Sequence, residues 1–118
     1  MRIEIPGVDT AMGLDLYDDD EDIFLIVLRS YADNLPASLE KLRNVSAETL
    51  ADYAITVHGV KGTSANIGAE ELRQIASKLE TMAKAGDLSG ILAQNEAFLK
   101  QADDLIKAIN NWLEKFDA

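Results

Sequence analysis

The chain contains no cysteine, only two prolines and only one histidine among its 118 residues. Without cysteine it can form no disulfide framework, no thiolate metal site and no cysteine nucleophile. The single histidine, His58, leaves too few ligands for the usual zinc sites, which need three or four nitrogen or sulfur atoms. We therefore exclude a disulfide-stabilised scaffold, a cysteine-dependent enzyme and a zinc enzyme, and we expect no bound metal.

The chain also has no apolar stretch long enough to cross a membrane. Its longest uninterrupted apolar run, residues 23–28, is far shorter than the roughly 20 residues that cross a bilayer. The N-terminal segment MRIEIPGVD lacks the apolar core of a signal peptide, so we expect a cytoplasmic protein without membrane contact. The formal net charge of -10 would repel nucleic acid and anionic membranes alike. Such acidity most often only keeps a small protein soluble, although it would also suit a partner with a basic surface.

Two motifs of ligand-binding proteins are missing. No glycine-rich loop of the form G-x-x-x-x-G-K-[ST] occurs, so the chain is not expected to bind ATP or to phosphorylate itself. The acidic run DDDED, Asp18–Asp22, lacks both the ligand spacing and the glycine of an EF-hand calcium loop. It is better interpreted as the start of a helix, where carboxylates face the positive end of the helix dipole.

What the sequence does contain is a helical pattern. Its apolar residues recur at spacings of three and four, and 47% of all residues are hydrophobic, which is enough for a packed core. The length is that of one domain, so residues 1–118 are predicted to form a single domain. The predicted class is all-α, an antiparallel four-helix bundle with a short N-terminal helical lead. The helices are expected near residues 10–14, 20–42, 47–67, 70–84 and 89–116.

Three details of these helices are specific enough to test. The apolar stripe of the second helix continues through Pro36, which predicts one helix kinked there or two helices nearly in line. Ser46 is the expected N-cap of the third helix, and Gly68 is the expected left-handed residue that ends it. In the last helix the predicted inward seam consists of Leu92, Leu99, Ala102, Ile106, Ile109, Leu113 and Phe116, with Ile91, Phe98, Leu105 and Trp112 beside it.

The segment AITVHGVKGTSANIGAEEL, residues 54–72, places two glycines beside the only histidine. Gly59 and Gly62 each cost a helix interior about 1 kcal/mol relative to alanine, so the helix is weakened twice around His58. At 100° per residue, His58 lies roughly 140° from the inward direction, and its imidazole is expected to face solvent or a groove. The inward seam of this helix is predicted to consist of Tyr53, Val57, Val60, Ser64 and Ile67.

A lone histidine on a helix is most often a surface or packing residue. That interpretation explains neither Lys61, a helix neighbour three residues on, nor the small side chains around the ring. A lysine is a poor neighbour for a protonated imidazole and a good one for an imidazole that will carry a negative group. Gly59, Gly62 and Ala65 would then leave room for another protein to approach His58.

These residues resemble the histidine-containing phosphotransfer (HPt) domain family of two-component phosphorelays. The sequence departs from the family pattern only mildly, at Gly59, where the family often has a larger residue. The lead IPGVDTAMGL and the segment LETMAKAGDL, residues 79–88, also look like the family. The resemblance implies a phosphorelay intermediate that carries a phosphoryl group and is not an enzyme, and from the apolar stripes of its helices we expect the bundle to be a monomer. In HGVKGTSANIGA the family pattern is matched by His58, Val60, Lys61, Gly62, Thr63, Ser64, Gly68 and Ala69.

The resemblance also implies roles and partners. His58 would accept a phosphoryl group from an aspartyl phosphate on the receiver domain of a hybrid kinase or response regulator, and would pass it to another receiver's aspartate. Lys61 would stabilise the phosphoryl group, Glu80 would orient the imidazole through Nδ1, and Lys84 would add positive charge. No cofactor is expected on this chain, and any Mg²⁺ would belong to the partner receiver. For Glu80 the plainer interpretation is a surface pair with Lys84, and both roles can coexist.

Two other functions remain open on the sequence alone. An HPt-like bundle could dock receiver domains without being phosphorylated, although the intact His58, Lys61 and Gly62 argue against this. An unrelated helical bundle could carry the motif by chance, but it would leave the pair of glycines beside the histidine unexplained.

Overall fold

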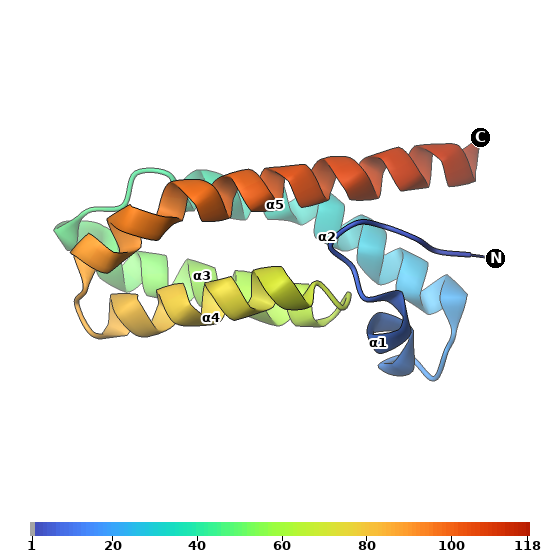
Figure 1. The fold of residues 1–118 in the computed structure, drawn as a ribbon, viewed down its shortest axis with the longest axis horizontal. Helices are drawn as coiled ribbons and strands as arrows, with labels where there is room; N and C mark the ends of the chain where they lie inside the picture. Colours follow the sequence, from blue (N-terminus) through green and yellow to red (C-terminus); the bar gives the residue numbers. More distant parts are fainter. Residues whose placement is uncertain (1) are drawn as a thin grey trace.

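The computed structural model describes residues 2–118, and every regular element within that range is helical. The all-α class predicted from the sequence is therefore confirmed. In Figure 1 the long helices run along the longest dimension of the molecule, and the short helix α1 lies at one end. The elements are α1 (Thr10–Asp15), α2 (Glu21–Leu42), the 3₁₀ turn η1 (Ala47–Thr49), α3 (Leu50–Ala65), α4 (Glu70–Lys84) and α5 (Leu88–Asp117).

Aspartate side chains begin three of these helices. The Asp20 carboxylate accepts a hydrogen bond from the backbone N–H of Ile23 at 3.1 Å, and Asp9 and Asp87 cap α1 and α5 in the same way. Each bond satisfies a backbone donor that the first turn of a helix leaves free. The predicted start of α2 at its acidic run is thus correct to one residue.

The third helix is shorter than predicted. Residues 47–49 form a 3₁₀ turn in which the Thr49 hydroxyl accepts a hydrogen bond from the backbone N–H of Ser46 at 2.8 Å. The α-helix proper begins at Leu50 and ends at Ala65, where the sequence pattern predicted residue 67. Gly68 lies just beyond with φ of +77°, the predicted left-handed conformation.

The second helix is continuous through Pro36, so the prediction of one helix is confirmed over that of two, and the predicted kink stays a prediction. Pro36 is exposed to solvent, so its ring does not disturb the inward stripe of this helix. Phe24, Leu28, Tyr31, Leu35, Leu39 and Leu42 are all buried along that stripe.

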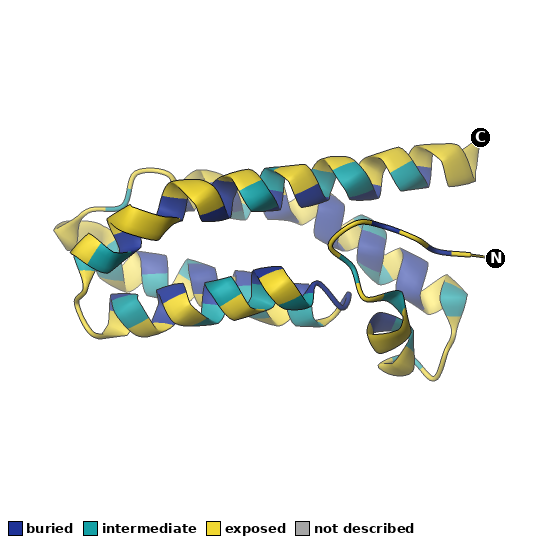
Figure 2. Ribbon diagram, viewed as in Figure 1, coloured by how far each residue is buried: buried dark blue, intermediate teal, exposed yellow. Residues whose placement is uncertain are grey.

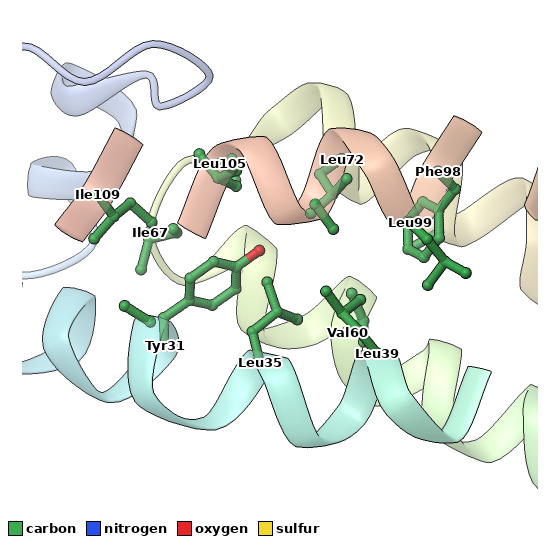
Figure 3. Packing of buried hydrophobic residues seen from close by; sticks show 14 of the residues in the cluster. Tyr31, Leu35, Leu39, Val60, Ile67, Leu72, Phe98, Leu99, Leu105 and Ile109 are labelled. Atoms are coloured by element: carbon green, nitrogen blue, oxygen red, sulfur yellow. The ribbon is translucent and has the colours of Figure 1, made fainter. Parts of the chain in front are cut away.

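The four long helices pack around one hydrophobic core. Helix α3 packs mainly on α4, α4 packs on α5, and α2 contacts both α3 and α5. Figure 2 shows buried residues on the inward faces and exposed residues outside, and in Figure 3 Leu39 of α2, Val60 of α3 and Phe98 of α5 lie in the shared interior. The predicted inward seam of the histidine helix is buried in full: Tyr53, Val57, Val60, Ser64 and Ile67.

The predicted seam of the last helix needs a correction. Leu92 is 57% exposed and Phe116 is also exposed, whereas the predicted neighbours Ile91, Phe98 and Leu105 are buried. The seam shifts because the polar Asn95 occupies an inward position, which an apolar pattern cannot reveal. Its side chain accepts a hydrogen bond from Tyr53 Oη at 2.7 Å and donates one to the Leu42 carbonyl at 2.8 Å. These bonds make the burial of an amide tolerable.

The N-terminal lead closes the end of the fold at which α3 turns into α4. Ile3 and Ile5 are buried in the core, the backbone N–H of Asp9 donates to the Gly68 carbonyl at 2.8 Å, and Tyr17 Oη donates to the Asn66 carbonyl at 2.8 Å. These contacts hold the C-terminal end of the histidine helix in place.

Two left-handed glycines provide a matched test of this closure. A Cβ at Gly68 would overlap the backbone oxygen of Asp9, whereas a Cβ at Gly86, with φ of +74°, would meet no atom within 4 Å. We expect Gly86→Ala to lower the free energy of unfolding by about 1–2 kcal/mol, the cost of a left-handed alanine. Gly68→Ala should lower it by more, because the lead must move as well. Urea denaturation checks this prediction, and equal losses would contradict it.

Candidate functional site

His58 lies in the middle of α3 with its imidazole at the surface. Its side chain is 63% exposed, and Nδ1 is 2.7 Å from Oε2 of Glu80 on the neighbouring helix α4. The inward seam of α3 is buried on the other side of the helix, so the helical period itself turns His58 outward, as the sequence pattern predicts.

Glu80 is the most buried charged group of the site. Its side chain is only 5% exposed, and both of its carboxylate oxygens have partners. Oε1 accepts a hydrogen bond from Lys61 Nζ at 2.6 Å, and Oε2 is 3.0 Å from Lys84 Nζ in addition to its contact with His58. The bond from Lys61, followed by that from Lys84, lowers the pKa of Glu80 from its ordinary 4.5 to about 2, so the group is ionised at neutral pH.

The charge of Glu80 decides which nitrogen of His58 can react. An ionised carboxylate can only accept a hydrogen bond, so the imidazole nitrogen facing it must carry a proton. In the neutral imidazole that proton on Nδ1 leaves the lone pair on Nε2. The site therefore has an exposed imidazole whose Nε2 keeps a free lone pair, while the buried Glu80 carboxylate binds the ring at Nδ1.

The backbone beside His58 carries no side chains at Gly59 and Gly62, and the space next to both residues is open. A Cβ added at either Gly59 or Gly62 would meet no atom within 4 Å, and both glycines are exposed, while Ala65 is half-buried. The packing of the chain itself thus requires neither glycine. The hydroxyl of Thr63 donates to the Gly59 carbonyl at 3.0 Å, one turn back, and so supplies a further contact to this stretch of backbone.

A cavity of about 270 Å³ opens next to Gly59, between α2 and α3. Gly59 and Thr63 form part of one wall, and Ser30, Asn34 and Ser38 of α2 line the other, with no charged side chain among the lining residues. Sequence reasoning missed the α2 wall. Its only signal is the four-residue spacing of three small polar side chains, which is too common on a helix surface to mark a site.

Other kinds of site are not seen in the described part of the chain. No group of three or more histidine or acidic side chains there is arranged to hold a metal ion. None of the helices within residues 2–118 is both long and apolar enough to span a membrane.

Comparison with known proteins gives one finding. The family model described as "Hpt domain" matches residues 26–112, which is most of the chain and includes His58, Lys61, Glu80 and Lys84. Helix α1 and the last residues of α5 lie outside the matched range. No match was found among curated proteins or among solved structures.

Proposed function

The chain belongs to the Hpt domain family, and on that premise we propose that it is a phosphorelay intermediate with His58 as the phosphorylated residue. Members of this family transfer phosphoryl groups through a histidine in two-component signalling. His58 receives the group from the aspartyl phosphate of one receiver domain and delivers it to the aspartate of another. The chain acts as a carrier with neither an ATP site nor kinase activity of its own. Any Mg²⁺ belongs to the receiver.

The chemical step needs no proton transfer on this chain. The Nε2 lone pair attacks phosphorus, the N–P bond forms, and the P–O bond to the aspartate breaks with its electron pair left on the aspartate carboxylate. The imidazole, already protonated on Nδ1, becomes a phosphorylated imidazolium. Glu80 faces that new positive charge at Nδ1 and stabilises it. Reversal of the same step returns the group to a receiver.

The observation that carries this proposal is the contact between a buried, ionised Glu80 and an exposed His58, 2.7 Å apart at Nδ1. It favours phosphorylation over a role in docking alone, since a surface that only docks has no need to fix the imidazole tautomer. Lys61 and Lys84, both in contact with Glu80, keep positive charge close to the imidazole that would carry the phosphoryl group. A monomeric antiparallel four-helix bundle in the cytoplasm is part of the same proposal.

The test is phosphoryl transfer from a receiver domain that carries radioactive aspartyl phosphate. The chain should become labelled through a bond that acid breaks and alkali leaves intact, as expected of phosphohistidine. The label should then pass to a second receiver. Labelling by ATP alone, or an acid-stable label, would overturn the proposal.

The glycine beside the histidine gives a prediction about access. Gly62→Ala should raise the free energy of unfolding by up to about 1 kcal/mol, because the added Cβ meets nothing and alanine favours the helix. Gly62→Gln should leave stability within about 1 kcal/mol of wild type and yet slow transfer in both directions, because its side chain occupies the approach to His58. Thermal melts and transfer rates on the same variants provide the measurements.

The control for this prediction is Ala97→Gln, on the exposed face of α5. It adds the same side chain far along the sequence from the histidine helix and should transfer at the wild-type rate. If Gly62→Gln also transfers at that rate, or unfolds the domain, the glycine serves the packing of the helix and not access.

A further inference from the structure

Two lysines share one carboxylate at this site, but they do not share it equally. Lys61 Nζ is 2.6 Å from Oε1 of Glu80 and its side chain is 30% exposed. Lys84 Nζ is 3.0 Å from Oε2, and its side chain is 67% exposed. Lys84 therefore has the longer contact and the more solvated side chain, on the oxygen that also faces His58.

Removing either lysine from Glu80 has different consequences for the carboxylate. If Lys84 leaves, Oε2 keeps its bond to His58 Nδ1 and Oε1 keeps its bond to Lys61, so both buried oxygens stay paired. If Lys61 leaves, Oε1 loses the one side-chain partner it has among the described residues. An acceptor that is buried without a partner costs more than an exposed ion pair contributes. Lys84 is thus the lysine that can leave Glu80 at low cost.

Phosphorylation of His58 would add negative charge that a cation such as the Lys84 ammonium can bind. A phosphoryl group brings nearly two negative charges and three acceptor oxygens at neutral pH. Because Lys84 and His58 Nδ1 meet the same carboxylate oxygen, the Lys84 ammonium already lies next to the ring that becomes phosphorylated. Its flexible four-carbon stem allows the ammonium to move from the carboxylate toward the phosphoryl oxygens.

We propose, on the basis of the phosphotransfer function above, that the two lysines have separate roles. Lys84 changes partner when His58 is phosphorylated, leaving Glu80 and binding the phosphoryl oxygens. Lys61 stays on Glu80 in both states and acts as a positioning residue that keeps the carboxylate aimed at Nδ1. The expectation from the sequence assigned phosphoryl stabilisation to Lys61 and additional positive charge to Lys84, whereas here the phosphoryl contact belongs to Lys84 alone. Only ion pairs are exchanged, and both ammonium groups keep their protons.

The experiment compares Lys84→Ala, Lys84→Arg, Lys61→Met and the control Lys78→Ala. The control also removes one positive charge from α4, but Lys78 forms no ion pair with Glu80. Two quantities are measured on each variant of residues 1–118. The first is the fraction of phosphorylated His58 at equilibrium with a phosphorylated receiver. The second is the ¹⁵N chemical shift of both imidazole nitrogens across pH before any phosphorylation.

The phosphorylated fraction gives the equilibrium constant for phosphorylation of His58 by the receiver. Lys84→Ala should lower this constant about 5-fold or more relative to Lys78→Ala. Lys84→Arg should restore most of the lost phosphorylation. The imidazole ¹⁵N shifts before phosphorylation should keep the wild-type tautomer in Lys84→Ala. Lys61→Met, which keeps most of the alkyl chain, should change the ¹⁵N shifts and their pH profile in the unphosphorylated protein.

Two results would overturn the division of roles. One is a Lys84→Ala equilibrium constant equal to that of Lys78→Ala. The other is a Lys61→Met variant that keeps wild-type ¹⁵N shifts and loses only the phosphorylated state. Neither result would affect the proposed function, which is tested separately by phosphoryl transfer from a receiver to the wild-type protein.

Discussion

Replacing His58 with glutamine is expected to abolish labelling by a phosphorylated receiver. An amide nitrogen has no available lone pair, so no N–P bond can form, and His58 is the only histidine in the chain. Because the side chain is 63% exposed and contributes no core contact, helicity and the melting temperature should stay close to those of wild type. Labelling assays and circular dichroism on the same preparation provide the measurement.

The outcome of this substitution separates the functions that the sequence left open. A module that only docks receivers would bind His58→Gln and wild type alike and would take no label in either case. A helical bundle with a chance motif would neither dock nor take label. Label that persists in His58→Gln would show that another residue is the acceptor and would refute the assignment.

Substitution of Glu80 by glutamine is expected to slow phosphoryl uptake about 5- to 30-fold. Glutamine keeps an oxygen that accepts from Nδ1 but removes the charge that stabilises the imidazolium. A hydrogen bond to a charged group contributes about 1.5–3 kcal/mol and a neutral one about 0.5–1.5, so the loss is about 1–2 kcal/mol in the transition state. Single-turnover transfer rates measure it. A wild-type rate would show that the charge of Glu80 is not used.

The same variant also tests the electrostatics of the folded state. Contacts with Lys61 and Lys84 lower the pKa of Glu80 to about 2, from an ordinary 4.5. Since the folded-state pKa is the lower one, the stability that this carboxylate contributes is fully present above pH 4.5 and is lost as the pH falls toward 2. The difference in the free energy of unfolding between wild type and Glu80→Gln should therefore shrink over that interval. A difference that stays constant from pH 5 to pH 2 would contradict the lowered pKa.

Local chemistry made much of the fold predictable. Capping aspartates, a left-handed glycine and apolar spacings of three and four act within a few residues, so α2 and α4 were located to within about one residue at their starts. The same spacing turned His58 outward, because four buried residues of α3 define the opposite face. The glycines beside His58 were noticeable for a related reason, since a helix tolerates two of them only where something other than helix stability is selected.

The sequence by itself determined the helices, the exposed histidine and its resemblance to a phosphotransfer motif. Only the tertiary structure decided that Asn95 faces inward, because the packing of the helices brings the Tyr53 hydroxyl and the Leu42 carbonyl to its amide. Only the tertiary structure, likewise, buries Glu80 and brings Lys61 and His58 of α3 onto its two oxygens, whereas the pair with Lys84 follows from the spacing along α4. The spacing of residues along one helix fixes which way a side chain points, but a charge shared by groups on two helices depends on how those helices pack.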